Sequence, residues 1–85
     1  MQQFSYVIKD ELGLHARPAG LLVKAAAVFK STVTLEAKGK SVDAKKLIRV
    51  MGVGVKQNDE VVLKIEGEDE EAAAAALETF FGENL

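Results

Sequence analysis

The sequence predicts an α+β fold in which a four-stranded, mostly antiparallel sheet is covered on one face by three helices. Segments of alternating apolar residues, typical of half-buried strands, occur at four places in the 85 residues. Segments with apolar residues at three- and four-residue spacing, typical of amphipathic helices, separate and follow them. The resulting order is strand, helix, strand, strand, short helix, strand, helix, which favours helices layered on an antiparallel sheet.

The composition is that of one folded domain, which we expect to span residues 1–85. Hydrophobic residues make up 48% and charged residues 28%, an ordinary globular balance. With no cysteine and one histidine, the chain has no disulfide framework and argues against a structural zinc site. We therefore expect neither a metal nor another cofactor.

The charge and hydropathy patterns exclude several classes of partner. A formal net charge of -2 is too close to neutral for a nucleic-acid binder without strong charge segregation. No apolar run approaches the roughly 20 residues that a membrane span needs. The first residues are not a basic-then-apolar signal sequence. We predict a cytoplasmic protein that acts without stable membrane insertion.

The first strand and the first helix are separated by a charged loop that ends at Gly13. The strand's apolar set is Phe4, Tyr6 and Ile8. The helix then has one apolar face, formed by Ala19, Leu22, Val23, Ala26 and Phe29. Pro18 is compatible only with the first turn, because proline lacks the N–H that a helix interior needs. The helix should therefore begin at His15 or Ala16, within a residue or two.

The middle of the chain reads as a hairpin, a short helix and a further strand. Alternation at Val33, Leu35 and Ala37 predicts the second strand, and a turn over residues 38–40 leads to a short strand through Val42. Residues 45–51 form a short helical segment that Gly52 and Gly54 end or loosen. The fourth strand turns Val61, Leu63 and Ile65 to one face.

The last helix follows a charged turn. Asp69 is its predicted N-cap, and Glu70 and Glu71 complement the positive end of the helix dipole. We expect its buried face to contain Ala73, Leu77 and Phe80, with Phe81 beside them.

The start of the first helix is the predicted functional site. A helix N-terminus offers unpaired N–H groups and a positive partial charge, which together bind anions. These N–H groups begin at Ala16, and Arg17 adds a planar fork of donors suited to phosphate oxygens. The positive field also disfavours a protonated imidazole, so His15 should keep a nitrogen lone pair free for attack. Histidine can form covalent intermediates, so this arrangement predicts a transferable phosphoryl group on His15. The alternative is an exposed or capping histidine.

A docking surface is predicted beside His15, although its residues admit another interpretation. The first helix turns an outward stripe to that side, consisting of Arg17, Gly20, Leu21 and Lys24. In the short helix, Leu47, Ile48 and Met51 either form a docking patch with Leu21 or join Val50 in filling the open side of the core. Lys24, Lys45, Lys46 and Arg49 would give the patch a basic rim and predict an acidic partner. Gly20 either admits a partner closely or reflects tight packing on the sheet.

The residues Gly13-Leu14-His15-Ala16-Arg17-Pro18-Ala19 resemble the phosphorylation signature of HPr, the phosphocarrier of the bacterial phosphoenolpyruvate:sugar phosphotransferase system. The likeness covers nearly the whole chain, including residues 39–42, 45–54 and 66–70. It implies an open-faced β-sandwich and a phosphoryl group on Nδ1 of His15, steadied by Arg17. Enzyme I would be the donor, and IIA domains of sugar permeases would be the acceptors. The protein itself would be a monomer. Both partners would dock on the first helix and on residues 47–52. The docking residues in that second segment would be Leu47, Ile48, Arg49, Met51 and Gly52.

Two positions depart from the HPr pattern. Lys46 occupies the place of a regulatory serine found in many members, which implies that serine-based control is absent. Leu12 replaces a small polar residue, so a side-chain hydrogen bond near the site should be lost. A regulatory docking module switched by phosphorylation is the alternative function, and an unrelated small domain with an incidental histidine is a third.

Overall fold

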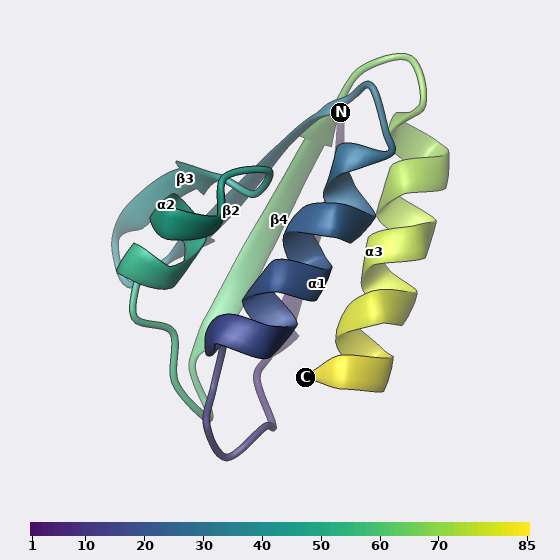
Figure 1. Cartoon of the computed structure of the whole chain (residues 1–85). Helices are drawn as coiled ribbons and strands as arrows, with labels where there is room; N and C mark the ends of the chain where they lie inside the picture. The colour runs from purple at the N-terminus through teal and green to yellow at the C-terminus, as the bar shows by residue number, and fades with distance from the viewer.

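Three helices cover one face of a four-stranded antiparallel sheet, which confirms the predicted fold class and order of elements (Figure 1). The computed structural model describes residues 1–85. Its elements are β1 (Gln2–Val7), α1 (Ala16–Ala27), β2 (Thr32–Ala37), β3 (Lys40–Asp43), α2 (Leu47–Gly52), β4 (Glu60–Glu66) and α3 (Glu70–Asn84). None of these helices combines the length and apolar character required to cross a membrane.

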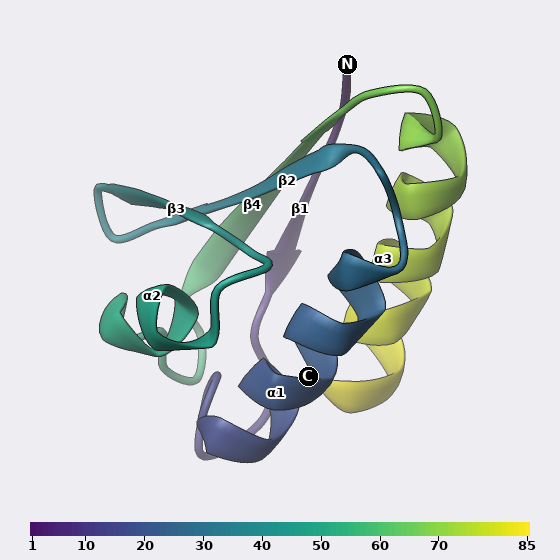
Figure 2. The same cartoon turned by 45° about the horizontal axis from the view of Figure 1, so that its top comes forward.

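The sheet has the order β1-β4-β2-β3, with every neighbouring pair antiparallel. The register brings inward side chains opposite one another: Leu63 of β4 faces Phe4 of β1 on one side and Leu35 of β2 on the other. Figure 2 shows the helices on one side of these strands, with α2 apart from the α1–α3 pair. The other face of the sheet is left without a helix.

The core forms where α1 and α3 press their apolar faces onto the sheet. From α1, the buried residues are Pro18, Ala19, Leu22 and Ala26, and Val23 is half-buried against the core. Phe29, predicted on the same helix, lies beyond its end at Ala27 and is also half-buried against the core. The buried strand residues predicted from alternation, Val33, Leu35, Ala37, Val61, Leu63 and Ile65, all lie in it. Ile8 follows the end of β1 and is also fully buried.

The buried face of α3 differs from the prediction in one residue. Phe81 is fully buried and Phe80 only half-buried, whereas the helical spacing favoured Phe80. The ring of Phe81 lies among three aromatic neighbours, with centroid distances of 6.0 Å to Phe4, 5.6 Å to Tyr6 and 5.8 Å to Phe80. Packing against β1, which local spacing does not encode, selects Phe81 for the core.

The short helix α2 begins two residues later than the predicted segment. Asp43 accounts for this, because its Oδ1 accepts the N–H of Lys45 at 2.8 Å and its carbonyl accepts the N–H of Lys46 at 3.1 Å. These bonds form a turn that competes with the helix. Lys46 is left as the N-cap, with extended backbone angles.

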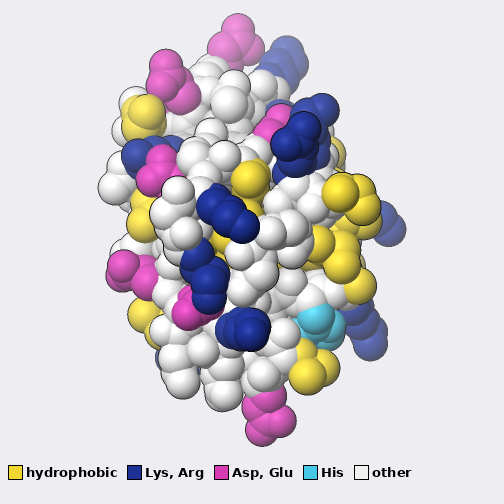
Figure 3. Space-filling model, turned by 90° about the vertical axis from the view of Figure 1, so that its left-hand side faces the viewer, with side chains coloured by type: hydrophobic (Ala, Val, Ile, Leu, Met, Phe, Trp, Pro, Cys, Tyr) yellow, Lys and Arg dark blue, Asp and Glu magenta, His cyan; other side chains and the backbone are white.

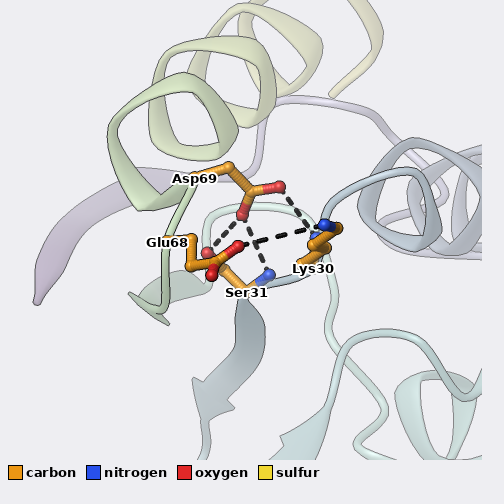
Figure 4. A network of polar contacts seen from close by, with 4 residues as sticks. All are labelled: Lys30, Ser31, Glu68 and Asp69. Carbon is orange, nitrogen blue, oxygen red and sulfur yellow. Dashed lines mark hydrogen bonds and ion pairs between the residues drawn. The ribbon is translucent and has the colours of Figure 1, made fainter.

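A polar junction ties the end of α1 to the start of α3 (Figure 4). Asp69 holds the predicted N-cap position, but its carboxylate makes no capping bond to its own helix. It accepts instead the backbone N–H of Lys30 at 2.8 Å, the backbone N–H of Ser31 at 2.9 Å and the Ser31 hydroxyl at 2.5 Å. Glu70 accepts the N–H of Gly67 at 3.1 Å. The predicted N-cap residue is therefore confirmed, but its carboxylate binds a segment distant in sequence instead of its own helix.

Candidate functional site

His15 is the N-cap of α1, within the predicted boundary. Its backbone is extended, and its side chain makes no capping hydrogen bond. The chain is anchored on both sides of it: the N–H of Leu14 donates to the carbonyl of Val55 at 3.1 Å, and the N–H of Ala19 donates to the carbonyl of His15 at 2.9 Å. Because its neighbours are held and its own side chain is not, the imidazole is positioned yet free to react.

Gly13 determines how the loop reaches this position. Its φ is +67°, a left-handed conformation that side chains disfavour. A Cβ atom here would lie 2.6 Å from the Cα of Lys56, so only glycine allows this close approach of the two backbone segments. Its N–H donates to the carbonyl of Asp10 at 2.9 Å, which closes the turn before His15.

The N-terminus of α1 leaves its positive end unneutralised. The first helical hydrogen bond is donated by Ala19, Pro18 has no N–H, and no partner in the protein accepts the N–H of Ala16 or Arg17. No acidic residue lies in the first turn. Unpaired donors and an uncompensated dipole are the features that the predicted anion site beside the imidazole requires.

A pocket of about 290 Å³ contains His15 and Arg17 together. Its lining residues are Asp10, His15, Arg17, Pro18, Leu21 and Asn84. A larger hollow of about 600 Å³ lies on the helix-free face of the sheet, around outward residues such as Thr32 and Thr34, and includes neither His15 nor Arg17. The two residues predicted to transfer the phosphoryl group therefore share the smaller pocket.

Two pocket residues were not predicted from the sequence. Asp10 places its Oδ1 3.8 Å from Nε2 of His15, and the same oxygen accepts the N–H of Leu12 at 2.8 Å. An aspartate at the start of a charged loop, a residue type that often bonds the N–H two positions on, was the available signal. Asn84 reaches the pocket from the end of α3, which only tertiary packing reveals. The Leu12 side chain points to solvent and forms no hydrogen bond there.

The apolar residues predicted to dock are exposed, and the remaining apolar residue of α2 is buried. Ile48 is 80% exposed, and Leu21, Leu47 and Met51 are 42%, 39% and 40% exposed, whereas Val50 is fully buried. We call the four exposed residues the apolar patch. Figure 3 shows apolar side chains on the same face as the histidine, with lysine and arginine side chains across that face. The exposure of Leu47, Ile48 and Met51 excludes the alternative that all four apolar residues of α2 fill the core, and docking on this surface stays a prediction.

The predicted basic rim is also divided. Lys24, Lys46 and Arg49 are exposed, as is Arg17. Lys45 is half-buried, and its Nζ donates to the carbonyl of Phe29 at 2.7 Å, so it links the turn before α2 to the segment that follows α1. Gly20 is half-buried, but a Cβ atom there would meet nothing within 4 Å, which excludes tight packing on the sheet as the reason for glycine. The exposed Gly52 likewise has open space around it.

Comparisons with known proteins point to one family. The family model described as "PTS HPr component phosphorylation site" matches residues 2–83. The phosphocarrier protein HPr of Mycoplasma genitalium is 41% identical over 85 residues, which cover 99% of this chain and 97% of that protein.

Solved structures agree with the sequence matches. A Mycoplasma histidine-containing phosphocarrier protein superposes with a TM-score of 0.91 at 35% identity, over 93% of this chain and 90% of that one. HPr of Thermoanaerobacter tengcongensis gives a TM-score of 0.88 at 44% identity over 100% of both chains. Crh of Bacillus subtilis, described as a domain-swapped dimer, gives 0.77 at 39% identity over 100% of this chain and 98% of that one.

Proposed function

The chain belongs to the HPr family of phosphocarrier proteins, and we propose that His15 is the residue on which it carries the phosphoryl group. The chain is a phosphocarrier of the phosphotransferase system: an intermediate in phosphoryl transfer and not itself an enzyme. These matches do not favour the alternative of a docking module whose phosphorylation is only a signal. Its partners are other components of that system.

The position of His15 at the start of α1 is the single observation that carries this proposal. In the transfer, a ring nitrogen with a free lone pair attacks phosphorus, and the bond from phosphorus to the donor breaks. The three peripheral phosphoryl oxygens then lie beside the unpaired N–H groups of Ala16 and Arg17. The guanidinium of Arg17, in the same pocket, neutralises part of their charge.

The nitrogen that accepts the phosphoryl group is proposed to be Nδ1. Nε2 is the nitrogen that faces Asp10, at 3.8 Å, and the two ring nitrogens point in divergent directions. Nδ1 therefore lacks the carboxylate that would repel an incoming phosphoryl group. The apolar patch and its exposed basic rim lie beside this nitrogen's pocket, of which Leu21 is a shared member.

Phosphorylated enzyme I is the proposed donor, and IIA domains of sugar permeases are the proposed acceptors. Both would dock on the apolar patch, where Arg17, Lys24, Lys46 and Arg49 favour an acidic surface. Gly20 and Gly52 would let either partner approach the backbone closely. We propose that residues 1–85 act in the cytoplasm as a monomeric domain, without a serine switch at Lys46.

Labelling with enzyme I and phosphoenolpyruvate tests the proposal. We expect one acid-labile phosphoryl group per chain, and no label on His15→Ala. Because His15 is the only histidine in the sequence, a single substitution removes every candidate phosphohistidine. Equal labelling of His15→Ala would overturn the assignment, and a Ser41→Ala control should label like the wild type.

A further inference from the structure

We propose that Asp10 is a positioning residue for phosphoryl transfer, acting through Nε2 of His15. The inference rests on the proposed role of His15 and adds a second group to that site. The Asp10 Oδ1 lies 3.8 Å from Nε2, slightly beyond hydrogen-bond reach. Hydrogen bonds at reaction centres are often long before the reacting group binds, and a small ring rotation closes this one.

The main chain fixes the position of the Asp10 carboxylate. Its Oδ1 accepts the N–H of Leu12 at 2.8 Å, which holds the side chain across its own turn. The backbone is held as well, since the Asp10 N–H donates to the main-chain oxygen of Leu85 at 2.9 Å and its carbonyl accepts the N–H of Gly13. The carboxylate is therefore in place before any partner arrives.

The chemistry at Nε2 explains what a carboxylate does there. A neutral imidazole carries one proton, and only the nitrogen without it can attack phosphorus. An anion facing Nε2 favours the tautomer with the proton on Nε2 and the lone pair on Nδ1. When Nδ1 bonds to phosphorus and the donor group departs with its electron pair, the ring keeps its Nε2 proton and becomes positively charged.

The same carboxylate then stabilises the phosphorylated ring. Asp10 faces the positive charge from Nε2, while Arg17 and the helix N-terminus face the negative phosphoryl oxygens. In the onward transfer the bond between Nδ1 and phosphorus breaks, its electron pair returns to Nδ1, and the proton stays on Nε2. No proton has to enter or leave the site in either direction.

Asp10→Asn separates this role from a structural one, because the asparagine oxygen still accepts the Leu12 N–H. Asp43→Asn is the matched control: its Oδ1 accepts the N–H of Lys45 at 2.8 Å in the same kind of turn, yet Asp43 is not in the His15 pocket. Tautomers are read from the ring ¹⁵N resonances, which come from one histidine only. The spectra are recorded at alkaline pH, so that the two tautomers of the neutral ring are compared.

We expect Asp10→Asn to move the tautomer ratio about threefold toward the Nδ1 proton and to slow transfer about fivefold, as for a partly exposed ion pair. The KM for the partner and the Asp43→Asn values should stay those of the wild type. An unchanged tautomer ratio and transfer rate in Asp10→Asn would overturn the role of Asp10. Absence of wild-type labelling by enzyme I would instead overturn the proposed function, while the tautomer measurement would still decide on Asp10.

Discussion

The N-termini of α1 and α3 are built in opposite ways. The first turn of α3 contains Glu70 and Glu71, and Glu70 also accepts the N–H of Gly67. The first turn of α1 contains no acidic residue, and its N-cap His15 makes no side-chain capping bond. One helix end is neutralised by its own carboxylates, and the other is left positive.

The two helix N-termini serve different purposes: the polar groups of α3 stabilise the fold, and those of α1 are proposed to serve function. At α3 the neighbouring Asp69 binds the chain at Lys30 and Ser31, so the polar groups of this end are used within the fold. At α1 the N–H groups of Ala16 and Arg17 have no partner within the protein and are available to the phosphoryl group proposed on His15. A helix N-terminus that lacks acidic and capping side chains therefore indicates a binding site. Substitutions that add or remove polar side chains at the two helix ends test this inference.

The largest effect on transfer is expected from placing an acidic side chain in the first turn of α1, as in α3. Ala16→Glu places a carboxylate in the exposed first turn, one residue after His15. The added carboxylate carries one negative charge and the phosphoryl group carries two. At a separation of about 6 Å, their repulsion should slow transfer about a hundredfold at an intermediate effective dielectric. Transfer rates from phosphorylated enzyme I measure it, while the melting temperature should hold or rise.

Ala27→Glu is the control for that substitution, since it adds the same side chain at the exposed C-terminal end of α1. Its transfer rate should stay within about twofold of the wild type, because screening weakens charge effects beyond a Debye length of about 8 Å. Equal slowing by both variants would mean that net charge, and not the helix end, determines transfer.

Removing the cation at α1 should have the next largest effect. Arg17→Ala should lower the transfer rate about tenfold, because a charge-assisted contact to phosphate is lost. Stability should change little, since an exposed arginine contributes about 1 kcal/mol or less to folding. A large fall in melting temperature with unchanged transfer would contradict the assigned role.

Substitutions at the N-terminus of α3 should change the free energy of unfolding but not the transfer rate. Ser31→Ala removes a buried hydroxyl that donates to Asp69, and should lower the free energy of unfolding by about 1–2 kcal/mol. Urea unfolding measures this loss, with the exposed Ser41→Ala as the control. Transfer from enzyme I should be unaffected, and a parallel loss of transfer would show that the two ends are coupled.

Acid titration should give the smallest effect. The hydroxyl of Ser31, followed by the N–H groups of Lys30 and Ser31, lowers the pKa of Asp69 to about 2. Because an unfolded aspartate has a pKa of about 3.9, this carboxylate stabilises the fold above that pH, and the stabilisation is lost as the pH falls from about 4 to about 2. The melting-temperature gap between wild type and Asp69→Asn should narrow across that window. A melting-temperature gap that stays constant with pH would show that the charge of Asp69 does not stabilise the fold.

The sequence was sufficient for the fold because its buried positions follow simple periods. Alternation at Val33 and Leu35, and helical spacing at Ala19 and Leu22, identify residues that are fully buried. His15 and Arg17 could be placed at one helix end because Pro18 restricts where that helix starts.

What the sequence could not supply depends on contacts between distant segments. Asp69 carries the local signature of a capping residue, yet it binds Ser31. Phe81 displaces Phe80 from the core because Phe4 and Tyr6 of β1 pack against it. Asp10 becomes a candidate only once the loop turn brings it to His15.

The strand order has a consequence for how the chain folds. The β2–β3 hairpin joins near neighbours, with Ala37 opposite Lys40, whereas β1 must find β4 across most of the chain, with Gln2 opposite Ile65. Loop-closure entropy makes such distant pairing slow, so β1 should join the sheet late. The loop to His15 follows β1 directly, so the proposed phosphoryl-accepting site should also form late in folding.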